Sequence, residues 1–365
     1  MAVIEVEGLW KIFGGDPERA RTLAQDEGLS KAEVKEETDS VIAVNDANFD
    51  VQEQEIFVVM GLSGSGKSTL LRCVNRLVEP TFGTVRVHGE NVTAYDQEQL
   101  RQIRRTKMSM VFQNFGLFPH RTVLGNVEYG LEISGADEKK RQDKARRTLE
   151  LVGLEGYEDS NPGELSGGMQ QRVGLARALV NDPEILLMDE AFSALDPLIR
   201  EEMQNELLDL QDMWDPAATI LFITHDLDEA LKMGDRIAIM KDGEIAQIGT
   251  PTEILTNPAD DYVESFVQNV DRTKVIPVRT VMRAPTDEEA ERLTEEDPSV
   301  SLHTSIAEVL PRVLETDGPV AVRDSAGTLK GIVSQKDVMA EITRNASNVS
   351  KTREASRHAE KMETA

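Results

Sequence analysis

The stretch Gly61–Thr69 reads GLSGSGKST and fits the pattern G-x-x-x-x-G-K-[ST]. It follows Glu55–Met60 (EIFVVM), an apolar run that predicts a buried strand, and it opens a segment typical of a helix. In this context glycines let backbone N–H groups close around phosphate oxygens, and the helix N-terminus favours the anion. A chance glycine-rich turn would not be expected to have both neighbours. The sequence therefore predicts a phosphate-binding loop, called the phosphate loop below.

Two side chains of the phosphate loop carry specific chemistry. Lys67 is expected to reach the β- and γ-phosphates of a nucleotide, and Ser68 is expected to offer its hydroxyl to Mg²⁺. The other nucleotide-binding positions predicted in the loop are Gly61, Ser63, Gly64, Ser65, Gly66 and Thr69.

A pair of acids ends a second apolar run, Ile185–Glu190 (ILLMDE). Asp189, at the end of a buried strand, suits Mg²⁺. Glu190 lies where a carboxylate can polarise an attacking water. Adjacent acids at a strand end are sometimes only surface polarity, but a phosphate loop in the same predicted sheet favours the catalytic interpretation.

Strands and helices alternate after the phosphate loop and end in the hairpin signal RIAIMKDGEIAQIG, which predicts an α/β core with antiparallel additions. A polar segment at 14–40 interrupts the first strand pattern and is interpreted as an inserted helical piece. The composition changes near residue 271, where we place a small α/β domain at 271–343 and a polar, loose tail at 344–365.

Charge and cysteine content restrict the partners. The 365 residues hold 40 Lys and Arg against 66 Asp and Glu, a net charge of −26, which argues against nucleic acid as the main partner. A solvated acidic surface, as in halophilic proteins, is the simpler interpretation of that charge. The single Cys73 is predicted to be a core residue, and we expect a cytosolic protein without a signal peptide. No apolar run approaches 18 residues, so the chain is not expected to cross the bilayer itself, and association with a partner that does stays open.

A second anion-binding pattern occurs at Pro162–Leu179, PGELSGGMQQRVGLARAL, where a serine and two glycines open a predicted helix. With LSGGMQQ before ILLMDE, then SALD, then ITHD, the chain resembles the ATP-binding cassette of transport ATPases from Val3 to about Gly249. The resemblance implies a P-loop NTPase fold at 1–270, with a RecA-like core, an antiparallel β subdomain and a helical subdomain at about 114–165. It also implies why two anion sites exist, because the cassettes form a head-to-tail homodimer with two ATPs at the interface.

The same resemblance assigns roles to individual residues. The signature residues Ser166, Gly167, Gly168 and Gln170 would act on the ATP of the partner subunit, and the loop from Ser193 to Asp196 would cross to that subunit. Gln113 would contact Mg²⁺ and the membrane subunit, which makes Ser68, Gln113 and Asp189 the implied metal set.

Two further assignments concern the ends of the nucleotide. His225 would hold the γ-phosphate and the attacking water, so the implied catalytic residues are Glu190, His225 and Lys67. Without the resemblance, this histidine could equally cap the helix that follows it. Phe13 would stack on adenine, although Trp10 is close enough to compete for that role.

Three features narrow the resemblance to ATPases for glycine betaine and proline uptake: the insertion at 14–40, the segments Met60–Val85 and Met110–Gly135, and GIVSQKD at Gly331–Asp337. The last resembles the end of a cystathionine-β-synthase-type (CBS) domain. The implied function is ATP-driven import of quaternary amine osmoprotectants. The implied partners are integral membrane permease subunits and, indirectly, an extracytoplasmic substrate-binding protein, with the chain at the cytoplasmic face of the cell membrane. The alternatives are an importer ATPase for methionine, phosphonate or another solute, and a soluble cassette ATPase outside transport.

Other features stay open at this stage. The apolar stretch from Gln113 to Gly135 suits either docking on a membrane subunit or internal core. Only one clear CBS-like copy is found, and we hypothesise that two copies pair across the dimer. Ser334 and Asp337 either bind an adenosine ribose or form a structural turn. Attractions between exposed charges weaken as the salt concentration rises. The C-terminal domain is therefore expected to restrain the ATPase at low ionic strength and to release it when cell salts become concentrated.

Overall fold

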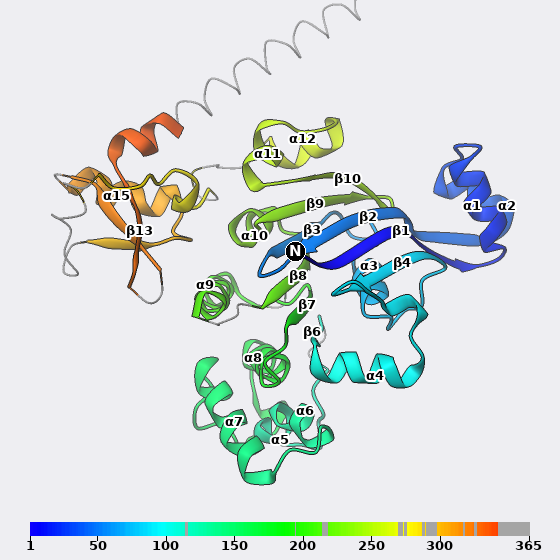
Figure 1. The fold of residues 1–365 in the computed structure, drawn as a ribbon, viewed down its shortest axis with the longest axis horizontal. Helices are drawn as coiled ribbons and strands as arrows, with labels where there is room; N and C mark the ends of the chain where they lie inside the picture. The colour runs from blue at the N-terminus through cyan, green and yellow to red at the C-terminus, as the bar shows by residue number, and fades with distance from the viewer. Residues whose placement is uncertain are drawn as a thin grey trace, which may run out of the picture.

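The structure is a computed structural model, and it describes residues 1–113, 116–193, 195–213, 218–268, 273, 276–286, 289, 298–316, 318–324 and 327–341. Its centre is a six-stranded sheet in the order β10-β9-β3-β8-β7-β6 (Figure 1). The strands are β3 (Ile56–Met60), β6 (Met108–Val111), β7 (Ile185–Asp189), β8 (Thr219–Thr224), β9 (Arg236–Lys241) and β10 (Glu244–Gly249). All pairs are parallel except β10 with β9. The predicted α/β class is thereby confirmed.

A four-stranded antiparallel sheet in the order β2-β1-β4-β5 packs against the central sheet. Its strands are β1 (Ala2–Gly14), β2 (Ser40–Gln52), β4 (Phe82–Val87) and β5 (Glu90–Asn91). Phe57 and Val59 of β3 face this sheet, whereas Ile56, Val58 and Met60 face the helices on the other side, so β3 is buried on both faces. Cys73 is fully buried between the sheets, as predicted for a core residue.

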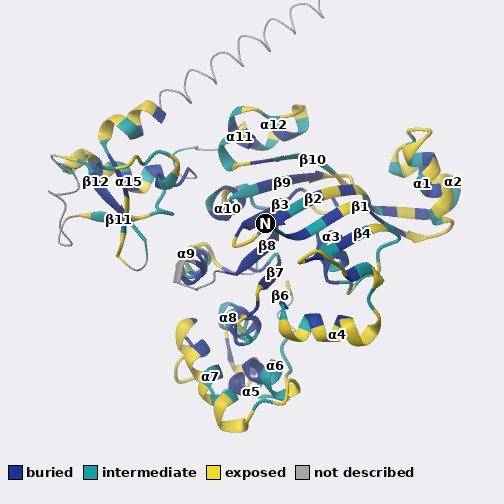
Figure 2. Cartoon of the chain, in the orientation of Figure 1, coloured by how far each residue is buried: buried dark blue, intermediate teal, exposed yellow. Residues whose placement is uncertain are grey.

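Two helices, α1 (Pro17–Gln25) and α2 (Lys31–Thr38), lie within the segment interpreted as an insertion. Asp16 caps α1, and Ser30 forms a capping box with Glu33 at the start of α2. The pair packs on Trp10, Ile12 and Ile42 of the first two strands through Ala20, Leu23 and Val34. Figure 2 shows that the outer faces of both helices are exposed.

The remaining helices of the cassette part are α3 (Lys67–Val74), η1 (Val92–Ala94), α4 (Gln97–Thr106), α5 (Val123–Val127), α6 (Tyr129–Ile133), α7 (Glu138–Leu151), η2 (Pro162–Glu164), α8 (Gly167–Leu179), α9 (Pro197–Met213), α10 (Leu227–Met233), α11 (Pro251–Thr256) and α12 (Asp261–Val267). Of these, α5 to α8 pack together in the region expected to be a helical subdomain. Val123, Leu124 and Val127 are buried there, so the middle of the apolar stretch from Gln113 to Gly135 is internal core, whereas Gln113 and Ile133 are exposed.

The C-terminal part contains η3 (Val278–Thr280), β11 (Ser299–Ser301), α15 (Ile306–Glu315), β12 (Val320–Arg323) and β13 (Leu329–Val333), and the chain is helical over 335–341. Its three strands form one mixed sheet. Arg279 of this part forms an ion pair of 3.2 Å with Asp235 of the cassette. The expected boundary between residues 270 and 271 and the expected tail at 344–365 lie outside the described residues. Within the part of the chain that is described, no helix is long and apolar enough to span a bilayer.

Candidate active site

The phosphate loop connects the carboxyl end of β3 to α3, as its sequence context predicts. Gly66 has φ +105°, and a Cβ there would lie 2.1 Å from the carbonyl oxygen of Ala43, so only glycine fits this turn. The loop is also held from outside, because the backbone N–H of Gly243 donates to the carbonyl of Ser65 over 2.9 Å. The loop therefore rests on β2 and on the β9–β10 turn.

Lys67 is almost fully buried and points back along the phosphate loop. Its Nζ donates to the carbonyls of Gly61 (2.7 Å) and Leu62 (3.0 Å) and lies 3.9 Å from Oε1 of Glu190. Burial lowers the pKa of Lys67, and the charges of Glu190 and Asp189 oppose that shift. A cation is thus held where phosphate oxygens would replace backbone carbonyls as its partners.

The two predicted acids lie beside the phosphate loop because β7, β8 and β3 are parallel neighbours whose carboxyl ends meet at one edge. Asp189 is completely buried, and its Oδ2 accepts from Arg72 over 2.9 Å. Its Oδ1 is buried without a hydrogen-bond partner, and so is Oγ of Ser65. Two unpartnered buried oxygens near Lys67 fit a hydrated Mg²⁺ and phosphate, since a hard cation takes oxygen ligands.

Glu190 contacts residues from three other segments of the chain, those of Gln113, His225 and Lys67. Its Oε2 accepts from Nε2 of Gln113 (3.1 Å) and lies 3.3 Å from Nδ1 of His225, while Oε1 faces Lys67. Its φ of +46° is left-handed, which is uncommon for a residue other than glycine and is often found at functional sites. Gln113, Glu190, His225 and Lys67, predicted from separate motifs, thus form one cluster.

The two candidate adenine aromatics differ in exposure. Trp10 is 1% exposed and packs against α1 and α2, whereas Phe13 is 44% exposed. Phe13 pairs with the exposed Val41 in the β1–β2 ladder, and Nζ of Lys11 lies 4.6 Å from its ring centroid. A nucleotide base can therefore reach Phe13 and not Trp10.

The signature residues lie at the start of α8. Ser166 is the N-cap and accepts from the N–H of Met169, and Gln170 donates to the carbonyl of Leu165. A Cβ on Gly167 would meet open space, so its backbone can be closely approached. Within the part of the chain that the structure describes, no hydrogen bond or ion pair joins Ser166 to the phosphate loop of its own chain.

The loop from Ser193 to Asp196 precedes α9. Ser193 donates to the carbonyl of Glu190, and Asp196 caps α9 through the N–H of Ile199. Asp196 is exposed, whereas Leu195 is buried against α8. Ala194 lies outside the described residues.

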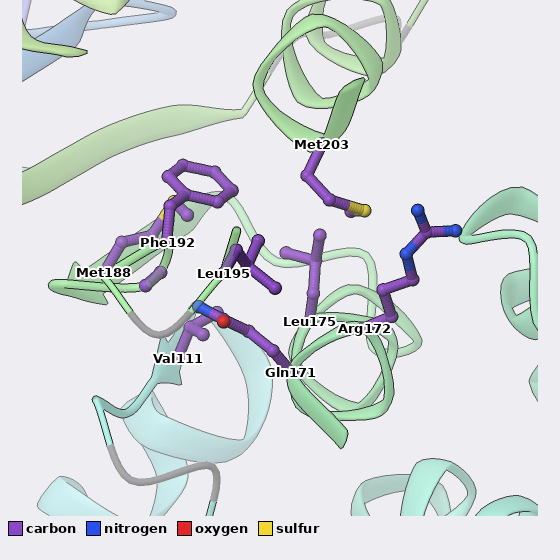
Figure 3. Close-up of a pocket in the computed structure, with 9 residues that line it drawn as sticks. Val111, Gln171, Arg172, Leu175, Met188, Phe192, Leu195 and Met203 are labelled. Carbon is purple, nitrogen blue, oxygen red and sulfur yellow. The ribbon is translucent and has the colours of Figure 1, made fainter. Parts of the chain in front are cut away.

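A small cavity lies behind this loop, lined by residues of β6, β7, α8 and α9 (Figure 3). Gln171 extends into it toward Leu195 and Val111, and its Oε1 is buried without a partner. The cavity holds only about 10 Å³, too little for any part of a nucleotide, so it belongs to the packing of α8 against the sheet.

Several residues of the site were missed from the sequence. Arg72 holds Asp189, and Arg200 of α9 contacts both Leu195 and Asp226. Glu229 is buried beside Thr224 and Gln204, and burial raises its pKa. These contacts join different helices, strands and loops, so the spacing of residues along the sequence does not predict them.

In the C-terminal part, Ser334 and Asp337 bond to each other: the hydroxyl and the N–H of Ser334 both donate to Oδ2 of Asp337, over 2.6 and 2.9 Å. This is the geometry of a structural turn that begins the helix at 335–341.

Comparison with known proteins places these features in context. The family model described as ABC transporter matches residues 44–193. The glycine betaine transport ATP-binding protein OpuAA of Bacillus subtilis is 59% identical over 280 residues, which span 77% of this chain and 66% of that protein. The glycine betaine/carnitine transport ATP-binding protein GbuA of Listeria monocytogenes is 47% identical over 96% of this chain and 100% of its own length.

Two other similarities agree with these. The glycine betaine/proline betaine transport system ATP-binding protein ProV of Escherichia coli is 54% identical over 77% of this chain and 69% of its own length. A solved dimeric ATP-binding cassette, in a post-hydrolysis state bound to ADP and Pi, is 31% identical and superposes with a TM-score of 0.58 over 68% of this chain and 98% of that one.

Proposed function

This chain belongs to the ATP-binding cassette (ABC) transporter family, and from that premise we propose that it is the ATP-hydrolysing subunit of an importer for glycine betaine, proline or related quaternary amine osmoprotectants. The observation that carries the cargo class is the Listeria relative, whose whole length aligns with 96% of this chain. That likeness includes the inserted helices and the C-terminal part, and it therefore reaches beyond the ATPase motifs that all cassettes share.

Hydrolysis depends on the cluster around Glu190. Its carboxylate takes the proton of the attacking water, and His225, which holds Glu190 through Nδ1, keeps its other ring nitrogen for the γ-phosphate and the water. Lys67 exchanges its backbone carbonyl partners for β- and γ-phosphate oxygens. Mg²⁺, held by Ser68, Gln113 and Asp189, would supply charge neutralisation on the phosphates.

The dimer completes each site. Ser166, Gly167, Gly168 and Gln170 reach the γ-phosphate bound to the partner subunit, while Phe13 stacks on the adenine of its own ATP. The accessible backbone at Gly167 supports this arrangement, because an anion at the N-terminus of α8 would meet N–H donors without steric obstruction. ATP then joins the two subunits, and release of products separates them.

A groove beside Gln113 suits the membrane subunits. It holds about 450 Å³ and is lined by Arg72, Leu77, Val78, Phe112, Gln113 and Gly116. Leu77 is 48% exposed and Phe112 is 36% exposed, and both are large apolar side chains. Docking of a permease helix in this groove would move Gln113, and with it the hydrogen bond to Glu190. The chain then works as a peripheral subunit at the cytoplasmic face of the cell membrane.

Residues 271–343 form a CBS-like regulatory domain in this proposal. Leu314 and Met339 are large apolar side chains that are exposed in this part, and such side chains would be covered if two domains pair across the dimer. The part-exposed ion pair of Arg279 with Asp235 is the kind of contact that salt weakens, which suits restraint of the ATPase at low ionic strength.

The test is uptake of labelled glycine betaine after a salt upshift, in cells that hold the permease and the binding protein but no other importer. Cells with the intact chain are compared with cells that carry Lys67→Ala. Uptake that disappears only with the variant supports both the transport role and the cargo. If uptake is equal in the two strains, the cargo assignment is wrong.

A further inference from the structure

Arg200, in the first turn of α9, contacts two loops that flank the active site. Its Nη2 donates to the carbonyl of Leu195 over 3.3 Å, within the loop from Ser193 to Asp196. Its Nη1 donates to Oδ2 of Asp226 over 3.1 Å, in the residue that directly follows His225. One guanidinium therefore bridges the two loops.

The His225 side of this bridge is firmly fixed. Asp226 caps α10 through Oδ1, which accepts from the N–H groups of Asp228 and Glu229. Thr224, on the other side of His225, accepts from the N–H of Asp226 and donates to the buried carboxylate of Glu229. Both neighbours of His225 thus belong to one hydrogen-bonded unit, and a displacement of Asp226 would move the histidine.

The Leu195 side is positioned to sense the other subunit. On the proposed function, the loop from Ser193 to Asp196 crosses to the partner, while His225 acts on the ATP of its own chain. We infer that Arg200 is a positioning residue that couples the two ATP sites, transmitting the arrangement of the loop at the subunit interface to His225. This inference rests on the proposed function.

A purely structural role is the competing explanation, because Arg200 also ties α9 to α10. The side chains of Arg200 and Asp226 are only 27% and 30% exposed, and Nε of Arg200 also lies 3.9 Å from Oε1 of the buried Glu229, so Arg200→Met is expected to lower the stability as well. The two explanations differ in what is lost: coupling changes the cooperativity of hydrolysis between sites, whereas structural support changes only the stability.

The experiment measures ATP hydrolysis by the purified full-length chain against ATP concentration, for the wild type, Arg200→Met, Asp226→Asn and the double variant. Asparagine retains the helix-capping oxygen and removes the charge. The matched control is Arg236→Met, since Arg236 is 30% exposed and pairs with Asp50 and Glu55 away from both loops. Thermal unfolding of each variant reports its stability.

We expect Arg200→Met to reduce kcat roughly tenfold and to leave KM within about twofold of the wild-type value. The Hill coefficient, expected to exceed one in the wild type, should fall to one in this variant. The double variant should be no slower than the slower single variant, because both changes break the same contact. Arg236→Met should keep the wild-type Hill coefficient. A Hill coefficient unchanged in Arg200→Met, or losses that simply add in the double variant, would overturn the coupling. A wild-type chain that hydrolyses no ATP would instead overturn the proposed function and the coupling with it.

Discussion

Replacing Glu190 with glutamine should stop catalysis while leaving the fold and ATP binding intact. In the structure, Gln113 and His225 both meet the same carboxylate oxygen, at 3.1 and 3.3 Å. A glutamine can place its carbonyl oxygen there and keep both contacts. Its amide would then face Nζ of Lys67, which retains its bonds to Gly61 and Leu62. We therefore expect the free energy of unfolding to change by less than about 1 kcal/mol.

The rate should change much more, because the amide cannot take a proton from water. Loss of a general base lowers the rate by ~100-fold or more, equivalent to about 2.7 kcal/mol of activation free energy. The assay is phosphate release under saturating MgATP, with ATP affinity measured separately by a fluorescent analogue. Removal of a negative charge near the γ-phosphate should leave that affinity equal or tighter.

Glu184→Gln is the matched control, since Glu184 lies at the opposite end of β7, is half exposed and pairs with His88. It removes the same charge without touching the site, and its turnover should equal that of the wild type. If Glu190→Gln binds ATP and turns over within about threefold of the wild type, Glu190 is not the base and the proposed mechanism is wrong.

Three further outcomes are expected. Gly243→Ala should lower the free energy of unfolding by about 1–2 kcal/mol because φ is +84° there, and it should weaken ATP binding because Gly243 supports the phosphate loop. The control Gly89→Ala, at φ +76° with no neighbouring atom, should lower the stability in the same way without changing ATP binding. Equal ATP affinities in the two variants would show that Gly243 does not support the loop. Burial raises the pKa of the Cys73 thiol to about 12, so a thiol reagent at pH 8 should label Cys73 only after unfolding, and rapid labelling of the native chain would contradict the burial. Because the thiol ionises at lower pH in the unfolded chain than in the folded chain, its ionisation should favour unfolding as the pH rises above about 9. Truncation after Asn269 should remove the dependence of transport on ionic strength, and an unchanged salt response would exclude the C-terminal part as its source.

The sequence was most informative where chemistry is local. The phosphate loop and the two acids at the end of β7 could be located because consecutive residues carry out those roles, and the carboxyl ends of parallel strands share one edge. The resemblance then indicated that Gln113 and His225 belong with Glu190. Their meeting could not be derived from spacing, since the three come from segments separated by 77 and 35 positions along the chain (190 − 113 and 225 − 190).

Other features of the site could be identified only from the three-dimensional structure. The resemblance favoured Phe13 over Trp10 as the adenine aromatic without excluding Trp10, and only the packing of α1 and α2 on one face of β1 shows that Trp10 is buried and Phe13 exposed. The contacts of Arg72 with Asp189 and of Arg200 with Asp226 join residues 117 and 26 positions apart. Such pairs depend on how helices lie over the sheet, and the sequence of one chain alone carries no signal for them.

The proposed action of the signature turn at Ser166–Gly168 on the ATP of the partner subunit has a genetic consequence. If each chain contributes one half to each of two sites, as proposed, a copy with a defective Ser166 would damage the ATP site of a normal partner. In a cell that makes both forms, most dimers would contain at least one altered chain. An allele of this kind should therefore be dominant, and growth under osmotic stress should suffer even when an intact copy of the gene is present.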